Sequence, residues 1–317
     1  MIYIFLFLLS VVLTYIIKVY AIKKAIIDIP NERSSHSIPT PRGGGLSIMI
    51  VFYIGLVFFK DTISDGLFYA LWCSLPIVIV SLIDDIITLS SKSRFLVQSL
   101  STILALYFLG GVNSIDFIYF KIDSSLLNII AFFSIVWITN LYNFLDGIDG
   151  YAASQAIIGS LGLFLIFNNS LGMVLFVASS GFLVFNWHKA SIFMGDVGSA
   201  TLGFLFAIFC FSNTNDGNIY IWLVLLGFFW FDATVTLIRR YKNGENITKP
   251  HKKHAYQRLN QSGWSHSKIS LHLLIFNLIF LVLILFFSKE FIFYLFFTNL
   301  TLLYILMKFT DTKKSFE

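Results

Sequence analysis

Long apolar runs dominate this chain and limit what it can fold into. Hydrophobic residues make up 57% of its 317 residues and charged residues only 12%, whereas an average soluble domain carries roughly 25% charged residues. The runs are long and lack strand-like alternation, so the segments that cross a membrane are expected to be helices rather than barrel strands. The sequence therefore predicts an all-α polytopic membrane helix bundle, with residues 1–317 forming a single integral membrane domain.

A helix that crosses a bilayer needs about 20 apolar residues, with a range of roughly 17–25. The sequence predicts about eleven transmembrane helices, or alternatively ten. The least distinct segments are 95–111 and 198–213, which are short, and the last pair, which is joined only by a turn at 288–290. The N-terminal run lacks a basic start and a small-residue cleavage site, so we expect a retained first span rather than a signal peptide. The predicted spans are 1–20, 43–59, 66–83, 95–111, 125–142, 151–167, 170–187, 198–213, 219–238, 269–288 and 290–308.

The basic residues predict the orientation of these spans. Of the 22 Lys and Arg residues, only Lys60, Lys121 and Lys289 fall on one side of the predicted bundle. Cytoplasmic loops carry an excess of Lys and Arg, so the N-terminus is expected outside. The loops rich in acidic, His and Gly residues then all lie on the cytoplasmic face, which predicts one composite active site there.

Other classes of site find no support in the sequence. No run of Lys and Arg is interleaved with aromatic residues as on a nucleic-acid-binding surface. Cys73 and Cys210 both lie within apolar runs, where a small buried hydrophobe is the simpler interpretation than a disulfide partner. No Cys/His cluster has the spacing of a zinc site.

The segment 140–150, with the sequence NLYNFLDGIDG, is a short polar loop between two apolar runs. It contains Asn140, Asn143, Asp146 and Asp149, and each Asp precedes a Gly that allows close approach of the backbone to a ligand. Carboxylates beside hydrocarbon are costly and are retained mainly where they line a site. An ordinary turn between helices is the alternative, because Asp-Gly is common in turns.

Three further carboxylates predict a cation site. Asp84 and Asp85 end the third predicted span, and adjacent carboxylates there call for a cation, a shared proton or a basic partner such as Lys92 or Arg94. Asp196 stands between two Gly residues directly before a span, where it could cap that helix. Mg²⁺ favours few carboxylates together with phosphate oxygens, which Asp196 and a member of the Asp pair would suit.

Two basic loops are candidates for binding anions. Residues 34–45, SSHSIPTPRGGG, are rich in Gly, Pro and hydroxyl groups and contain His36 and Arg42. The consecutive Gly residues that lead into a helix are similar to a phosphate cradle, although Gly and Pro also mark ordinary loops. The largest inner loop carries His251, His254 and Arg258, for which anion binding and contact with anionic lipid are equally compatible with the sequence. Asp232, within the ninth span, is a site candidate, although an ion pair with Arg239 is the favoured interpretation.

Together these loops resemble the polyprenyl-phosphate N-acetylhexosamine-1-phosphate transferases, the MraY- and WecA-like family also called glycosyltransferase family 4. The resemblance runs from Arg33 to about Ser267, with the motifs in matching order. It rests on the loop 39–45, the Asp84-Asp85 pair, the Asn-x-x-Asn-Phe-x-Asp-Gly-x-Asp-Gly pattern of 140–150, the FMGDVGS motif of 193–199, and His251-x-x-His254.

Two departures concern the sugar rather than the reaction. Tyr256 and Gln257 follow the second His, where many family members carry further His residues, and this pattern resembles the O-antigen-initiating branch. Thr88 replaces a Lys that follows the Asp pair in the peptidoglycan translocases. Selectivity for the sugar is therefore expected around Tyr256, Gln257 and the first inner loop.

The resemblance implies a fold, a reaction and a location. The family transfers N-acetylhexosamine-1-phosphate from a UDP-sugar to undecaprenyl phosphate, which gives undecaprenyl-diphosphate-sugar and UMP and initiates a cell-surface polysaccharide such as lipopolysaccharide O-antigen. The implied location is the bacterial inner (plasma) membrane. The implied partners are UDP-N-acetylhexosamine, undecaprenyl phosphate and the bilayer, with no nucleic acid, and a homodimer is left open.

The resemblance also assigns roles to residues. Mg²⁺, or Mn²⁺ in its place, would be bound by Asp196 and Asp84. The catalytic carboxylates would be Asp84, Asp85, Asp146 and Asp149, without a choice of which, if any, accepts a proton. Substrate would contact Arg42, Lys92, Arg94, Asn140, Asn143, His251, His254 and Arg258.

A transporter or flippase for an anionic lipid-linked sugar is the competing interpretation. It would use Asp232 and the basic loops, but it predicts polar residues spread through the spans rather than gathered at one face. The CDP-alcohol phosphotransferases also use Asp residues and Mg²⁺ in a membrane. Their longer array of spaced Asp residues does not occur in this sequence.

Overall fold

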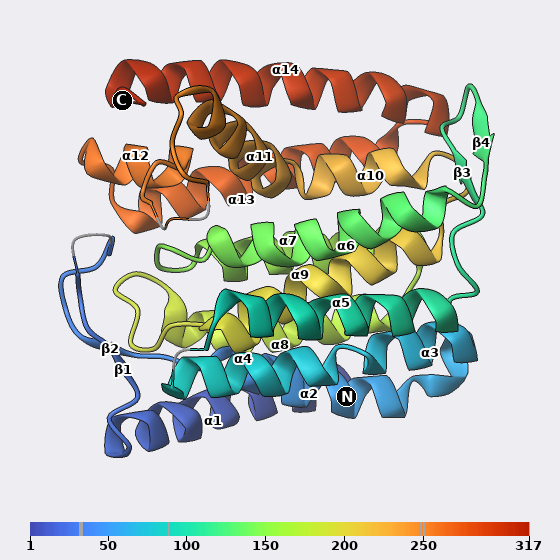
Figure 1. The fold of residues 1–317 in the computed structure, drawn as a ribbon. Helices are drawn as coiled ribbons and strands as arrows, with labels where there is room; N and C mark the ends of the chain where they lie inside the picture. The colour runs from blue at the N-terminus through green and yellow to red at the C-terminus, as the bar shows by residue number, and fades with distance from the viewer. Residues whose placement is uncertain (32–33, 88, 248, 250, 317) are drawn as a thin grey trace.

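The computed structural model describes residues 1–31, 34–87, 89–247, 249 and 251–316. Most of its helices run roughly along one direction as a bundle, and α11 lies obliquely to them (Figure 1). Arg33 and Thr88, which entered the family resemblance, lie outside these ranges. The helices are α1 (Ile2–Lys23), α2 (Gly45–Phe58), α3 (Asp65–Trp72), α4 (Leu75–Ile87), α5 (Ser91–Phe108), α6 (Leu127–Phe144), α7 (Tyr151–Phe167), α8 (Ser170–Asn186), α9 (Asp196–Ser212), α10 (Asn218–Leu225), α11 (Gly227–Lys242), α12 (Ala255–Gln261), α13 (His266–Phe286) and α14 (Lys289–Lys313), with the 3₁₀ turn η1 (Lys60–Thr62).

The described chain also contains two short antiparallel hairpins that the sequence did not predict. Strand β1 (Ile27–Asp28) pairs with β2 (Thr40–Pro41), and β3 (Ser114–Asp116) pairs with β4 (Lys121–Asp123). The two hairpins lie at opposite ends of the bundle (Figure 1). Both hairpins lie in connections between helices, and the apolar segments themselves are helical. The structure therefore agrees with the prediction of a polytopic helical membrane protein.

Five helical segments are long and apolar enough to cross a membrane, and a bent pair, α10 with α11, brings the count to six. The helices α2, α7, α8 and α9 are apolar but shorter. All of the predicted spans are helical in the structure, but their full number and their orientation stay predictions. The five segments are Ile2–Lys23, Asp65–Ile87, Leu127–Phe144, His266–Phe286 and Lys289–Lys313.

The predicted span 219–238 is broken rather than continuous. Helices α10 and α11 meet at an angle of 74°. A break frees backbone carbonyls that have no water to bond in an apolar surrounding. Gln155 Nε2 donates to the carbonyl of Leu225 at 2.7 Å, and Asn277 Nδ2 in turn donates to Gln155 Oε1 at 2.9 Å. Trp230 Nε1 satisfies a second carbonyl, that of Leu223, at 2.7 Å.

Helix α9 is the buried centre of the bundle. Every residue from Val197 to Phe211 is buried, and α9 packs against α6, α4 and α2. The first turn of α9 meets α2 where Gly45 faces Gly198, since a Cβ added to Gly45 would come within 2.3 Å of the Gly198 Cα. These two Gly residues therefore let the beginnings of α2 and α9 approach each other closely.

The loops that the sequence placed on one membrane face lie together at one end of the bundle, at the left of Figure 1. They are the segment between α1 and α2, the α4–α5, α6–α7 and α8–α9 connections, and the chain between α11 and α13. This clustering agrees with a single composite site.

Candidate active site

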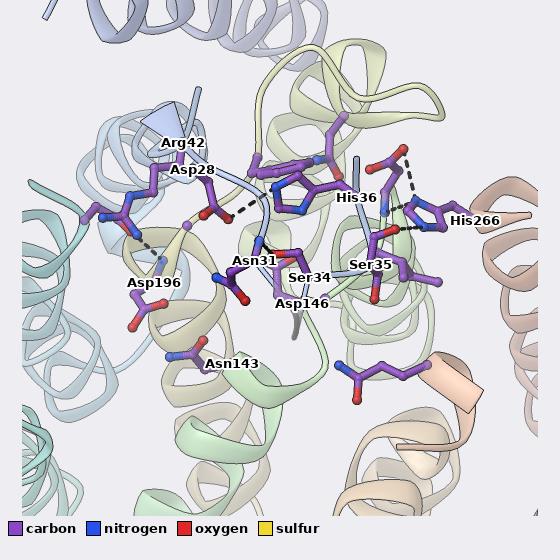
Figure 2. Close-up of a pocket in the computed structure, with 18 residues that line it drawn as sticks. Asp28, Asn31, Ser34, Ser35, His36, Arg42, Asn143, Asp146, Asp196 and His266 are labelled. Carbon is purple, nitrogen blue, oxygen red and sulfur yellow. Dashed lines mark hydrogen bonds and ion pairs between the residues drawn. The ribbon is translucent and has the colours of Figure 1, made fainter. Parts of the chain in front are cut away.

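A polar cavity of about 480 Å³ lies at this end of the bundle. Figure 2 shows Arg42 and Asp196 at one side of it and His266 at the other. Of the predicted site residues, it brings together Arg42, Asp85, Asn143, Asp146, Asp149 and Asp196. The remaining lining residues are Asp28, Asn31, Ser34, Ser35, His36, Gly147, Ile148, Asn186, Phe193, Gly195, Gln257 and His266.

Three carboxylates in this lining, Asp85, Asp146 and Asp196, form what we call the acidic centre. Asp85, near the end of α4, is 3% exposed and accepts hydrogen bonds from the backbone N–H groups of Asp196 at 3.3 Å and Val197 at 3.4 Å. These N–H groups open α9, where the helix dipole favours a negative charge. Asp85 therefore takes the capping role that the sequence suggested for Asp196, and the Asp196 side chain is left to face the cavity.

Arg94 bridges two of the predicted metal ligands. Its Nη1 lies 2.9 Å from Asp84 Oδ2 and 2.5 Å from Asp196 Oδ2. Asp84 also accepts a short hydrogen bond from the backbone of Leu89. Asp84 is not among the cavity-lining residues, and Lys92 is exposed. A divalent ion shared by Asp84 and Asp196 would therefore have to displace the Arg94 guanidinium.

Asp146 is a carboxylate affected by both burial and neighbouring negative charges. Burial raises the pKa of Asp146 well above its usual range, and the charges of Asp196, Asp85 and Asp149 raise it further. Such crowded carboxylates hold either a proton or a cation. The oxygen donors of the acidic centre, with the amide of Asn143, are those that Mg²⁺ prefers. In their chemistry the residues present therefore fit a magnesium ion.

Asp149 is in a different state from Asp146, three residues earlier in the same loop. Its Oδ2 lies 2.8 Å from His188 Nδ1 and 3.2 Å from His266 Nδ1, and it accepts a hydrogen bond from Ala190 N at 3.2 Å. Burial alone would raise the pKa of Asp149, but these contacts outweigh burial and hold it below its usual value. Asp149 thus holds the α6–α7 loop against the α8–α9 connection and the start of α13.

The two Asn residues of the segment 140–150 have different surroundings: Asn143 lines the cavity and Asn140 does not. Asn143 lines the cavity and accepts a hydrogen bond from Ser199 Oγ at 3.4 Å. Asn140 Nδ2 instead donates to Gln98 Oε1 at 2.8 Å and to the carbonyl of Val136 at 2.8 Å. Asn140 therefore joins α6 to α5 outside the cavity, and its contact with substrate stays a prediction.

The Gly residues of the first loop pair with the chain rather than form a free phosphate cradle. Gly44 N donates to the Phe193 carbonyl at 2.9 Å, and Gly45 N donates to the Met194 carbonyl at 2.8 Å. The expected cradle is therefore wrong for these two N–H groups. The pairing joins the first loop to the FMGD motif and holds Arg42 at the cavity wall.

Arg258, predicted to bind substrate, is instead bound to α14. Its side chain is only 1% exposed and donates to Asp311 Oδ1 at 2.7 Å and to the carbonyl of Lys314 at 2.9 Å. The ring of Phe316 covers the same guanidinium, with 5.4 Å between Cζ and the ring centroid. Arg239 also reaches Asp311, at 2.9 Å, so the expected ion pair between Arg239 and Asp232 is wrong.

Asp232 anchors the His-rich loop. It accepts hydrogen bonds from the backbone N–H of Ala255 at 2.9 Å and from Thr236 Oγ1 at 3.0 Å, and its Oδ1 lies 3.6 Å from His254 Nδ1. His254 is 3% exposed and does not line the cavity. Asp232, His254, Arg258 and Asp311 form what we call the paired cluster, in which each charge faces a partner.

His251 and Tyr256 also lie outside the cavity lining. Burial lowers the pKa of His251 to about 3, helped by His254 and Arg240, so this ring is neutral at physiological pH and offers no positive charge to a diphosphate. The Tyr256 hydroxyl donates to the Phe144 carbonyl at 3.1 Å behind the cavity wall. Gln257 is the residue of α12 that lines the cavity.

Two His residues escaped the sequence analysis: His266, which lines the cavity, and His188, which contacts Asp149 from outside the lining. His188 and His266 each stand at the end of an apolar segment, and an isolated His there was the available signal. In the first inner loop, the sequence singled out the segment 34–45 with His36, and Ser34, Ser35 and His36 line the cavity, whereas Asn31 was not singled out. Only the folded chain brings that loop to the acidic motifs.

Comparison with known proteins agrees with the motifs. Residues 67–214 match the family described as glycosyl transferase family 4. The chain is 33% identical over 279 residues to a "probable undecaprenyl-phosphate N-acetylglucosaminyl 1-phosphate transferase" of Bacillus subtilis, covering 80% of this chain and 75% of that protein. It is 29% identical over 319 residues to a decaprenyl-phosphate N-acetylglucosaminephosphotransferase of Mycobacterium tuberculosis (83% and 77% covered). It is 29% identical over 272 residues to a phospho-N-acetylmuramoyl-pentapeptide-transferase of Staphylococcus saprophyticus (73% and 79% covered).

Proposed function

This chain belongs to the MraY- and WecA-like glycosyl transferase family 4, and we propose that it transfers N-acetylhexosamine-1-phosphate from a UDP-sugar to undecaprenyl phosphate. An oxygen of the lipid phosphate attacks the β-phosphorus of the donor. The bond from that phosphorus to the bridging oxygen breaks, and the bond electrons leave with UMP. The acidic centre at the wall of a polar cavity is the observation that carries the proposal.

The cavity supplies what two anionic substrates need. Arg42 lines it, and Arg94 contacts Asp196 from behind its wall. Phosphoryl transfer depends mainly on positioning and on offsetting charge repulsion. A phosphate monoester near its second pKa of about 6 needs little help from a base. We therefore assign to the acidic centre the positioning of the reactants, rather than a proton transfer.

Mg²⁺, with Mn²⁺ as an alternative, would be held by Asp196 together with Asp85, Asp146 and Asn143. When bound, it would neutralise charge on the donor diphosphate and orient that group. Asp84 would act through Arg94, by keeping the guanidinium in place beside Asp196. The lipid phosphate would then meet Arg94 or Arg42 as it reaches the cavity.

Two apolar cavities could receive the hydrocarbon chain of the acceptor. One, of about 200 Å³, lies between α6, α9, α10 and α11, and the other, of about 410 Å³, lies between α11, α12, α13 and α14. Tyr151 and Tyr256 line the larger one. A Cβ on Gly147 would come within 2.1 Å of the Tyr256 hydroxyl, so this side chain separates the larger cavity from the polar one. Lipid and nucleotide could thus approach the centre from different sides.

We propose that this site faces the cytoplasm at the bacterial inner membrane and that the product initiates a cell-surface polysaccharide. The basic loops and the clustering of polar connections at one end of the bundle support this orientation (Figure 1). The identity of the hexosamine depends on the side chains that line the cavity, which include Gln257 and, from the first inner loop, Ser34 and His36.

The test is UMP release by the purified protein in detergent, with undecaprenyl phosphate, Mg²⁺ and a panel of UDP-N-acetylhexosamines. Release that requires both the lipid and the metal supports the proposal, and the best donor identifies the sugar. Reactions without lipid and reactions with a chelator are the matched controls. No release with any donor, from protein shown to be folded, would overturn the proposal and favour the transporter.

A further inference from the structure

A second group of metal-binding side chains lies beside the cavity, apart from the acidic centre. Asp149, His188 and His266 each offer one ligand atom, and these atoms all lie within 4.8 Å of one another. Asp149 and His266 line the cavity. Their side chains are each 8% exposed, whereas that of His188 is 31% exposed, so the group is open on one side.

The hydrogen bonds of His266 leave no hydrogen between its Nδ1 and the nearby carboxylate oxygen of Asp149. Its Nε2 lies 3.1 Å from the carbonyl of Ser35, and a carbonyl can only accept, so Nε2 carries a hydrogen. Its Nδ1 accepts from the backbone N–H of Asp149 at 3.3 Å, which requires a lone pair on Nδ1. That lone pair lies 3.2 Å from the anionic Oδ2 of Asp149. The contact is favourable when a proton or a metal cation lies between the two atoms, and repulsive otherwise.

His188 meets the same oxygen from another element. Its Nδ1 lies 2.8 Å from Asp149 Oδ2, and the His188 and His266 rings stand edge to face with centroids 5.3 Å apart. Ligands bound at about 2.0–2.1 Å to one tetrahedral ion lie roughly 3.3 Å apart. The His266 contact already has this spacing, and the His188 contact would widen by a few tenths of an ångström.

The surroundings of the group are those of a metal site. A metal-ligating His commonly donates its other ring N–H to a carbonyl, which fixes its tautomer, as His266 does toward Ser35. The ligands come from the α6–α7 loop, the α8–α9 connection and the start of α13. Asp149 is itself held, because Ser270 Oγ donates to its carbonyl at 2.9 Å and Ala190 N donates to Oδ2.

We propose that Asp149, His188 and His266 form a second divalent-metal site, which takes a first-row ion of the Zn²⁺ class through two imidazole nitrogens and one carboxylate oxygen. Two nitrogen donors favour such an ion over Mg²⁺, which prefers oxygen. Three protein ligands leave the fourth position for water or for a substrate oxygen from the cavity. The ion ties three elements of the cavity wall together. This site does not depend on the proposed transferase reaction.

Metal binding can be measured directly on the full-length protein, purified in detergent with an affinity tag that lacks His. Zn²⁺ content after dialysis in millimolar Mg²⁺, and the visible absorption of added Co²⁺, report the site without any activity assay. We expect about one Zn²⁺ per chain, with protons released on binding. The Co²⁺ spectrum should be that of a site with nitrogen ligands.

Matched variants separate this site from the rest of the chain. His188→Gln should weaken Zn²⁺ binding at least about tenfold, and because His188 is the most exposed ligand, the protein should stay folded. Asp149→Asn should do the same. His272→Gln removes an exposed His from the same helix as His266, one whose Nδ1 contacts the Lys268 carbonyl, and should bind as the unaltered protein does.

The same experiment can overturn the proposal. If folded protein retains far less than one Zn²⁺ per chain, the cation between His266 and Asp149 is a proton, and the three residues only form hydrogen bonds with one another. If His188→Gln binds Zn²⁺ as tightly as the unaltered protein, the ion lies elsewhere. Asp196→Asn should leave Zn²⁺ binding unchanged, so a loss there would place the ion in the acidic centre instead.

Discussion

The acidic centre and the paired cluster both contain Asp residues at the same end of the bundle, but the surroundings of these carboxylates differ. In the paired cluster, Asp232 and Asp311 each face backbone N–H groups or basic side chains, and Arg258 is fully covered. In the acidic centre, Asp196 is paired with Arg94, but the charge of Asp146 meets those of Asp196, Asp85 and Asp149 at the wall of a cavity. Ion pairs between buried side chains hold elements together, whereas several negative charges close together beside a cavity favour the binding of a cation.

This difference separates stability from function. Removing a partner from a buried ion pair leaves an uncompensated charge and costs about 3–5 kcal/mol of stability. Removing one of several like charges relieves repulsion and need not cost stability at all. Substitutions in the two regions should therefore have opposite effects on turnover and on unfolding.

The largest effect is expected from Asp196→Asn. We expect turnover to fall by roughly 10²–10³-fold, because a charge that positions the donor is lost. The thermal midpoint should change little, because Arg94 keeps Asp84 as a partner when its bond to Asp196 is weakened. UMP release and thermal unfolding in detergent would measure the two quantities on one preparation.

The matched control for that change is Asp232→Asn in the paired cluster, which keeps the shape of the side chain. It should lower the thermal midpoint, since the bonds to Ala255 and Thr236 are weakened, and leave turnover per folded molecule within a few-fold. Full Mg²⁺-dependent turnover by Asp196→Asn would remove that residue from the proposed metal site.

Arg258→Met should have an intermediate effect, on stability. The change removes the bonds to Asp311 and Lys314 while Met packs beside Met307, and we expect the free energy of unfolding to fall by about 3 kcal/mol. The KM for the UDP-sugar should not change, because Arg258 does not line the cavity. Denaturant or thermal unfolding and a KM measurement on the same variant would check this. A raised KM with unchanged stability would restore the substrate contact that the sequence predicted.

Some of this comparison could be predicted from the sequence. The apolar runs predicted the helices, because backbone in lipid has few alternatives to the helix. The motifs predicted Asp85, Asn143, Asp146 and Asp196 at one site, because acidic residues beside apolar runs are otherwise too costly. These inferences rest on local composition, which the sequence contains in full.

The rest depends on contacts between distant segments. Asp311 is 53 residues from Arg258 in the chain, and Ser35 is 231 residues from His266. Nothing local in the His-rich loop shows that α14 covers its Arg. The bend at Leu226 was also missed, because an apolar run reads the same whether the helix is straight or broken. Pairing across the fold decides which charged residues are free, and the sequence gives no direct sign of it.

The smallest effect concerns two carboxylates of one loop, Asp146 and Asp149, and appears in how stability depends on pH in the presence of a chelator. The pKa of Asp146 is raised in the folded protein, so the folded state binds more protons than the unfolded state above about pH 3.9, and stability falls as pH rises. The pKa of Asp149 is lowered, so its contribution is present above about pH 3.9 and is lost as pH falls below it.

Thermal midpoints measured from pH 3 upward should therefore separate the two variants. As pH rises, the stability of Asp146→Asn relative to the unaltered protein should increase by an amount on the order of 1 kcal/mol. Asp149→Asn should be less stable than the unaltered protein above about pH 4, and this difference should disappear at lower pH. Parallel curves for both variants would mean that the two carboxylates share one environment. Because both stand in the same loop before a Gly, only their partners differ, so divergent curves would show that partners across the fold, rather than the motif, set the role of each charge.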